Sequence, residues 1–299
     1  MKHLILAAAL ALSGCATAPI ANAQTAAQIP AQQIYLGETH VLQSRVMGDD
    51  RQINVWLPPS HGEAGRRFNV VYLLDGALDQ DFIHIAGLGQ LGALSWTYEQ
   101  LIIVGVQTRT RIAELTPPAT DPRYRSAFPN AGGAAQFRRF LAEEVIPFVE
   151  HRYQTGERRA LLGESLAGLF VVDTLLNEPA LFNDYVAISP SLWWDDRRFA
   201  ANASAMLERN GASGRRLYLA VANEGGTMQD GIDRLRAAIT AAPRGVSILY
   251  ADRSAMETHA TILHPAALDA MRWLYPMPPY DGETPWYMIE GASPPPTAN

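Results

Sequence analysis

The chain has 299 residues, of which 48% are hydrophobic and 18% charged, so it is long enough to bury one large core. Its formal net charge of -6, with no run of Lys and Arg, argues against a nucleic-acid partner, because phosphate binding needs clustered positive charge. No group of Cys and His residues has the spacing of a zinc site, so we expect neither a metal nor another cofactor.

The N-terminus predicts export. Lys2 and His3 precede an apolar run that is too short for a transmembrane helix and that leads into LSGC, ending at Cys15. This ending resembles the lipobox of bacterial lipoproteins, so we expect a signal peptide over 1–14 and a periplasmic protein anchored to the envelope membrane by lipid at Cys15. The alternative is a plain secretory signal cut after ANA, ahead of Gln24.

Both tails differ in composition from the rest of the chain. Residues 15–33 are rich in Ala, Gln and Pro without apolar periodicity, which predicts a flexible tether. Residues 277–299 are rich in Pro and predict an irregular C-terminal extension. A single domain is therefore expected over 34–276.

Within this domain, short apolar runs alternate with helical patterns. A half-buried strand is expected at 51–58, and buried strands at 69–76, 101–108, 159–165, 184–191, 216–223 and 246–252. Helices are expected at 134–153 (with a kink at Pro147), 166–179, 197–211, 231–243 and 264–275. This alternation predicts an α/β fold with a mostly parallel central sheet, helices on both faces, and a ligand site at the carboxyl ends of the strands.

Ser165 is the candidate nucleophile. It lies in LLGESLAG, where a predicted strand ends and a helix begins, and Gly163 supplies the small residue that a nucleophile elbow needs. Ala167 stands where the strict G-x-S-x-G pattern has glycine. The alternative is that Ser165 is an ordinary helix N-cap.

The base and the acid should follow the nucleophile in the chain. His259, in the loop after the last predicted strand, is the candidate base, and His264 at the start of the final helix is the alternative. Glu224 directly follows a strand, so its carboxylate could orient the imidazole and stabilise the imidazolium. Asp230 on the same loop and Asp195, with its neighbour 196, are the other candidates for the acid.

The oxyanion hole should combine the amide after the nucleophile with one from an earlier strand-to-helix loop. Leu166 supplies the first amide, and Ala77, after the Asp-Gly pair of YLLDG, supplies the second. An ordinary Asp-Gly turn would account for the same residues.

Five motifs now stand in order over about 200 residues: YLLDG, RTRIAELTP, GESLAG, ISPSLWW and ETH. In this arrangement the chain resembles the putative-esterase (esterase D-like) family of α/β-hydrolases, with most likeness to bacterial siderophore esterases. The resemblance implies the α/β-hydrolase fold, Ser165 as nucleophile, His259 as base, and the amides of Ala77 and Leu166 for the oxyanion. The acid transfers least securely, because family members vary in its identity.

Substrate contacts are expected from side chains that follow strands. Trp193 and Trp194 could line an aromatic cleft or could pack a loop. Arg111, with Arg109, could meet an acidic or polyphenolic substrate or could hold the loop 109–133 through an ion pair with Glu114 or Asp121. Long loops of this kind often act as lids or cleft walls.

The sequence therefore predicts a serine esterase that cleaves carboxylic esters of small molecules through an acyl-enzyme, with siderophore-type, aryl or short-acyl esters as candidate substrates. An acyltransferase that uses the same acyl-enzyme is one alternative. A non-catalytic surface protein on a hydrolase scaffold is the other.

Overall fold

A computed structural model of the chain describes residues 33–241 and 245–278. Residues from Leu36 onward belong to one compact unit, and only residues 33–35 of the preceding stretch are described. Cys15, the predicted signal peptide, nearly all of the predicted tether and the extension after Pro278 lie outside the described residues. Across the described ranges, no helix has the length and apolar character needed to cross a membrane.

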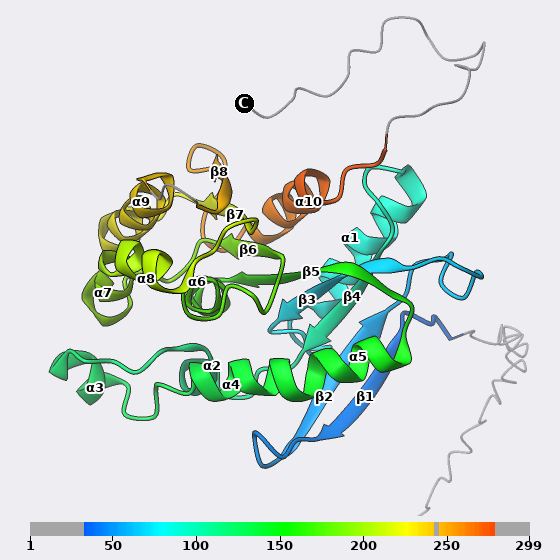
Figure 1. The fold of residues 1–299 in the computed structure, drawn as a ribbon, viewed down its shortest axis with the longest axis horizontal. Coiled ribbons are helices and arrows are strands. Elements are labelled where there is room, and N and C mark those ends of the chain that lie inside the picture. Colours follow the sequence, from blue (N-terminus) through cyan, green and yellow to red (C-terminus); the bar gives the residue numbers. More distant parts are fainter. Residues whose placement is uncertain (1–32, 242–244, 279–299) are drawn as a thin grey trace, which may run out of the picture. The chain divides into compact units, whose positions relative to one another are not determined.

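One sheet of eight strands forms the centre of the fold (Figure 1), in the order β1-β2-β4-β3-β5-β6-β7-β8. The strands are β1 (Glu38–Gln43), β2 (Asp50–Trp56), β3 (Phe68–Leu74), β4 (Leu101–Val106), β5 (Thr155–Glu164), β6 (Asp184–Ile188), β7 (Arg216–Val221) and β8 (Ser247–Asp252). The first two strands are antiparallel to their neighbours, and all the others are parallel. The predicted α/β architecture with a mostly parallel sheet is confirmed.

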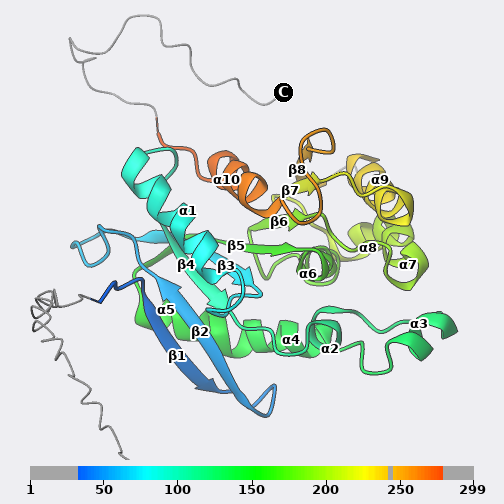
Figure 2. The same cartoon turned by 180° about the vertical axis from the view of Figure 1, so that it is seen from behind.

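Burial explains which strands the sequence revealed. All residues of β4 and β6 are buried, as continuous apolar runs predict for strands covered on both faces. The sequence did not predict β1, which lies at the edge of the sheet in a hairpin with β2 (Figure 2) and alternates between half-buried and exposed residues. Val41 in this strand is 63% exposed, so its apolar character marks no core position.

Helices cover both faces of the sheet. The α-helices longer than four residues are α1 (Phe82–Ser95), α2 (Arg111–Leu115), α3 (Pro122–Ala127), α4 (Ala134–Phe140), α5 (Ile146–Arg152), α6 (Leu166–Asn177), α8 (Ala203–Asn210), α9 (Gly226–Ala241) and α10 (Leu263–Leu274). Helices α1 and α10 pack on one face, and α4, α5, α6, α8 and α9 pack on the other (Figure 1).

Two predicted helices are interrupted. The one predicted over 134–153 contains a π-helical turn, Leu141–Val145, directly before α5, in which Pro147 occupies the first turn. Proline has no N–H to donate within the helix, so the backbone hydrogen bonds rearrange at this point. The one predicted over 197–211 is divided into α7 (Arg198–Ala201) and α8, after a short 3₁₀ turn, Trp194–Arg197.

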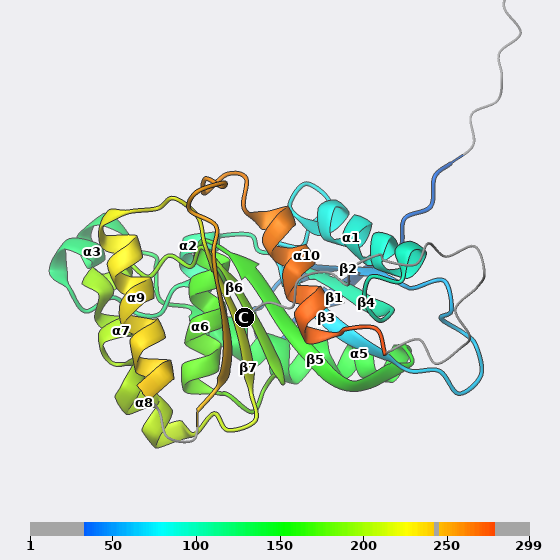
Figure 3. The same ribbon diagram turned by 90° about the horizontal axis from the view of Figure 1, so that it is seen from above.

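The carboxyl ends of the parallel strands meet at one edge of the sheet, which we call the catalytic edge. It carries the segments that follow β3, β4, β5, β6, β7 and β8, which begin at residues 75, 107, 165, 189, 222 and 253. The last of these leads from β8 to α10 (Figure 3). Ligands of open α/β sheets bind at such an edge, and every predicted catalytic residue lies on one of these segments.

Candidate active site

Ser165 occupies a strained turn between β5 and α6. Its backbone has φ 60° and ψ −118°, a region that a residue with a side chain rarely adopts. The turn is held by three backbone hydrogen bonds: the Ser165 N–H donates to the Ile188 carbonyl at 3.0 Å, and the Ser165 carbonyl accepts from Leu169 and Ser191. The hydroxyl makes no capping hydrogen bond to α6, so the N-cap role does not account for this serine. A strained serine at a strand-to-helix turn is the geometry of a nucleophile elbow.

Small residues allow the backbone to turn so sharply. A Cβ added to Gly163 would lie 2.7 Å from the methyl carbon of Ala167, closer than two carbon atoms can approach. It would also lie 2.6 Å from the backbone carbonyl carbon of Ala167, so glycine at 163 is what lets the start of α6 pass so close to the end of β5. The methyl group of Ala167, where the strict G-x-S-x-G pattern has glycine, is fully buried beside Gly163.

His259 and Glu224 meet at the same edge. The Asn223 N–H after β7 donates to the Glu257 carbonyl after β8 at 3.0 Å, which brings the two loops together. Nδ1 of His259 lies 2.8 Å from Oε1 of Glu224. The Glu224 side chain is 7% exposed and that of His259 is 43% exposed, so the pair has a buried carboxylate and an accessible imidazole. A carboxylate at Nδ1 fixes the tautomer in which Nε2 can accept a proton.

The other candidates have different partners. Asp230 pairs with Arg197 and Arg234, and Asp195 accepts hydrogen bonds from the Thr120 hydroxyl and from the backbone of Thr120 and Asp121. His264 lies in the first turn of α10, where its ring contacts the ring of His84 edge to face at 4.8 Å. These contacts leave Glu224 and His259 as the acid and base that the geometry favours.

Both predicted oxyanion donors, the amides of Ala77 and Leu166, lie on segments of the catalytic edge. Leu166 is the first residue of α6, where the amide has no partner within the helix and the helix dipole favours an anion. Ala77 follows Gly76 in the segment after β3, and its amide donates to Oε1 of Gln80 at 3.0 Å. A Cβ at Gly76 would lie 2.3 Å from backbone atoms of β4, so only glycine lets the loop pass here.

The two arginines after β4 form different ion pairs from those that the sequence suggested. Arg109 pairs with Asp49, and only its backbone amide contacts Glu114. Arg111 binds Oδ2 of the buried Asp75 through both Nε and an outer nitrogen, at 2.9 and 2.8 Å. Its side chain is 42% exposed, so the guanidinium also faces solvent.

The two tryptophans after β6 pack against α3. Trp194 is 1% exposed and donates its indole N–H to the Pro117 carbonyl at 3.1 Å, so packing of a loop, rather than the predicted substrate contact, accounts for it. Trp193 is half-buried, and its ring stacks on that of Tyr124 with the two ring centroids 6.2 Å apart. The loop 109–133 thus contains two short helices, α2 and α3, and it is fixed to the segment after β6 by these aromatic contacts.

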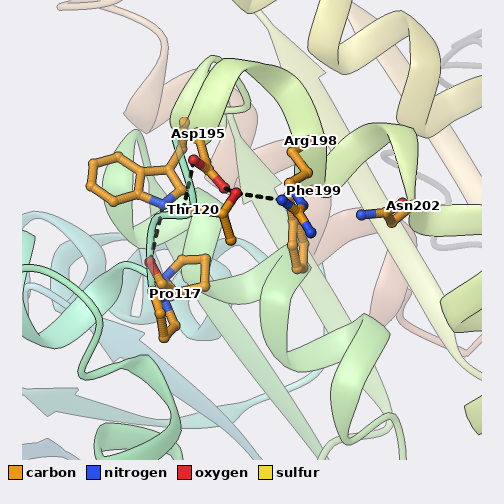
Figure 4. A pocket seen from close by; sticks show the side chains of 8 residues that line it. Pro117, Thr120, Asp195, Arg198, Phe199 and Asn202 are labelled. Carbon is orange, nitrogen blue, oxygen red and sulfur yellow. Dashed lines mark hydrogen bonds between the residues drawn. The ribbon is translucent and has the colours of Figure 1, made fainter. Parts of the chain in front are cut away.

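A small cavity of about 100 Å³ lies between this loop and the segment after β6 (Figure 4). Thr120 and Asp195 hydrogen bond to each other at its wall, and Arg198 donates to the Thr120 hydroxyl. Residues Asp195, Asp196 and Arg197 all have positive φ, which places a left-handed turn here. None of the predicted catalytic residues lines this cavity.

Sequence reasoning missed two residues beside the nucleophile. Ser191 is buried, and its Oγ lies 3.3 Å from Oγ of Ser165. Glu164 precedes Ser165, and burial raises the pKa of its carboxyl to about 7, with the Asp81 and Asp75 charges adding to the effect and the His259 and Arg111 charges opposing it. Ser191 belongs to the ISPS motif and Glu164 to GES, so both motifs were visible in the sequence. Only the fold shows that the ends of β5 and β6 are neighbours, which brings Ser191 to Ser165.

The mostly parallel eight-stranded sheet with helices on both faces is the α/β-hydrolase fold, and comparison with solved structures agrees with this fold. The sequence matches the family described as "Putative esterase" over residues 44–254, which is most of the chain, and the protein therefore belongs to that family. The resemblance inferred from the sequence motifs is thus confirmed.

Individual relatives carry esterase names. A "Siderophore enterobactin esterase" of Emericella nidulans is 35% identical over 173 residues, which cover 51% of this chain and 57% of that protein. The match therefore spans little more than half of the relative's length. An IroE-like serine hydrolase from Shewanella oneidensis has a similar structure, with a TM-score of 0.70, 27% identity and 80% of each chain covered. The BES protein from Bacillus cereus shares the fold, with a TM-score of 0.72 over 83% of this chain and 99% of that chain, at 22% identity.

Proposed function

We propose that this protein is a serine esterase that hydrolyses carboxylic esters through an acyl-enzyme. The observation that carries the proposal is the contact of His259 with the buried Glu224 at 2.8 Å, on the same sheet edge as the strained Ser165. A nucleophile, a base and an orienting acid are the groups that acyl transfer needs, and here they follow one another in the chain order of this fold.

In the proposed mechanism, Ser165 Oγ forms a bond to the ester carbonyl carbon while His259 Nε2 takes the hydroxyl proton. Glu224 accepts the Nδ1–H hydrogen bond and stabilises the imidazolium. The amides of Ala77 and Leu166 donate to the oxyanion. The tetrahedral intermediate then expels the alcohol, which receives the proton from His259. Water, activated by the same histidine, releases the acid and restores Ser165.

Siderophore-type esters are the substrate class that we propose. The support is the name of the Emericella relative, together with the family membership of this chain. The half-exposed Arg111 guanidinium and the half-buried Trp193 lie on segments of the catalytic edge, where they could contact an anionic or aromatic group.

A fluorophosphonate probe tests the mechanism. The wild-type protein should be labelled, because the probe is attacked by an activated serine, whereas Ser165→Ala should not be labelled and should lose ester turnover by about 10⁴-fold or more. His259→Ala should lose turnover similarly, and His264→Ala serves as the matched control that keeps it. Equal labelling of wild type and Ser165→Ala would refute the mechanism.

We also propose that the protein is exported and anchored by lipid at Cys15. Support comes from the LSGC ending of the N-terminal apolar run. Radiolabelled palmitate should enter the wild-type protein in bacterial cells and not Cys15→Ser. A protein released in soluble form after cleavage ahead of Gln24 would instead favour the plain secretory signal.

A further inference from the structure

The Ala77 amide, which the proposed function assigns to the oxyanion, already has an acceptor in this structure. Its N–H donates to Oε1 of the Gln80 side chain at 3.0 Å. Ala77 itself is 1% exposed, and a buried amide without an acceptor would cost free energy. The oxyanion can therefore bind this donor only by replacing the Gln80 carboxamide.

Gln80 is in turn fixed by the segment that follows β4. Its Nε2 donates to the Thr108 carbonyl at 2.9 Å and lies 3.3 Å from the Thr108 hydroxyl. Thr108 is 3% exposed, and its hydroxyl donates to Oδ1 of Asp75. Arg111 completes the chain of contacts by binding the other oxygen, Oδ2, of Asp75. The charge of the buried Asp75 is thus balanced by one guanidinium.

The backbone around Ala77 is also held, but by contacts of a different kind. The Gly76 N–H donates to the Val106 carbonyl at 2.9 Å, and the Asp81 N–H donates to the Asp75 carbonyl at 2.8 Å. Asp75 has φ 52°, so the loop leaves β3 in a left-handed conformation that its side-chain partners must stabilise. Of these contacts, the one made by the amide of Ala77 is the only one to a side chain that can rotate away.

We propose that Gln80, Thr108, Asp75 and Arg111 are positioning residues that aim the Ala77 amide at the oxyanion, with the Gln80 oxygen holding this amide until the oxyanion replaces it. We call these four residues the oxyanion brace. The proposal deepens the esterase mechanism and rests on it.

The brace favours the transition state over the bound ester. The carboxamide oxygen of Gln80 and the carbonyl oxygen of an ester are both neutral acceptors, so the ester gains little by exchanging one for the other. A developing oxyanion forms a charge-assisted hydrogen bond about twice as strong, so it displaces the carboxamide. The amide therefore contributes little to binding of the ester and mainly to the transition state, so its contribution appears in kcat rather than in KM.

Gln80→Met tests the brace, because methionine has a similar length but neither accepts from Ala77 nor donates to Thr108. We expect kcat to fall about tenfold, less than the 10²–10³-fold loss of a whole oxyanion donor, with KM unchanged or lower. Gln90→Met, the same change at an exposed position of α1, is the matched control and should match wild type in kcat, KM and melting temperature.

A trifluoromethyl ketone analogue of the ester supplies a readout that a purely structural role would not alter. Ser165 Oγ adds to its carbonyl carbon, His259 takes the proton, and the resulting hemiketal oxyanion binds the same amides. Its inhibition constant should rise about tenfold in Gln80→Met. Thr108→Val should weaken the inhibitor in the same direction, and Thr108→Ser, which keeps the hydroxyl, should restore wild-type binding.

Two results would overturn the brace. Tighter inhibition together with a higher kcat in Gln80→Met would mean that Gln80 only competes for the Ala77 amide. An unchanged inhibition constant and an unchanged kcat would mean that Gln80 neither positions this amide nor competes for it. Ser165→Ala measured in parallel separates the two proposals. If it is inactive while Gln80→Met is unaltered, the brace fails and the esterase mechanism stands, whereas an active Ser165→Ala refutes both.

Discussion

The two ends of the strand pair β5–β6 handle buried carboxyl groups in opposite ways. At the amino end, Asp184 pairs in register with Ala160 and is fully buried. At the carboxyl end, Glu164 pairs in register with Ile188 and directly precedes Ser165. The two carboxyl groups therefore lie at opposite ends of the same paired stretch of β5 and β6.

Asp184 has four hydrogen bonds from two arginines and a fifth from Tyr275. Burial alone would raise the pKa of its carboxyl, but the hydrogen bonds and charges of Arg216 and Arg158 outweigh burial and lower it. This end of the sheet therefore holds a fully paired carboxylate with a lowered pKa, at a structural junction between β5, β6, β7 and Tyr275.

Glu164 has no ion pair or side-chain hydrogen bond with any residue in the described ranges, and burial raises the pKa of its carboxyl to about 7. The backbone of the neighbouring Ser165 is strained, and the carboxylate of Glu224 is hydrogen bonded to the imidazole of His259. The carboxyl end of this strand pair thus carries a strained serine and a carboxyl without a side-chain partner in the described ranges, whereas the amino end carries a fully paired carboxylate.

The largest effect that separates the two ends should come from Glu224→Gln. Glutamine keeps the shape of the side chain but cannot stabilise the imidazolium, so kcat should fall about 10³–10⁴-fold while the melting temperature stays near that of wild type. Steady-state ester hydrolysis and thermal melting measure the two quantities. Asp230→Asn is the control, and a larger loss there than in Glu224→Gln would show that the acid has been assigned wrongly.

Asp184→Ala should show the converse behaviour. Removing this carboxylate leaves Arg158, Arg216 and the Tyr275 hydroxyl without their partner, so the free energy of unfolding should fall by about 3–5 kcal/mol. Urea denaturation measures the change, and Asp233→Ala in a solvated pair on α9 is the control, expected to lie within about 0.5 kcal/mol of wild type. A loss of kcat in the folded fraction of Asp184→Ala would contradict the separation of the two ends.

Glu164→Gln should have the smallest effect, absent below pH 4.5 and fully developed above pH 7. The unfolded glutamate titrates near 4.5 and the folded one near 7, so between these values the folded protein binds more protons. The free energy of unfolding of wild type should therefore decrease as pH rises from 4.5 to 7. Glutamine removes this dependence and should stabilise the protein at pH 8 by on the order of 1 kcal/mol, after allowance for solvent screening. Parallel pH–stability curves for variant and wild type would contradict the assignment.

The sequence could place two kinds of residue: those in a local pattern of apolar residues, and those whose order along the chain matches the order expected for the fold. The buried strands were predicted because continuous apolar runs suit parallel strands covered on both faces. Ser165, Glu224 and His259 were proposed from their positions after predicted strands, since parallel topology brings carboxyl ends to one edge. Edge strand β1 and the short helices α2 and α3 gave no such periodicity.

Only the tertiary structure decided which side chains meet across that edge. The sequence left Glu224, Asp230 and Asp195 open as the acid, because all three follow strands, and the packing of the loops after β7 and β8 brings Glu224 to His259. In the same way, the pairing of β3 with β4 brings Arg111 and Thr108 to Asp75 across more than thirty residues of chain. Local propensity determines which segments become strands and helices, and their order along the chain follows directly from the sequence. Contacts between distant loops depend on which strands are neighbours in the sheet, and no local pattern encodes that.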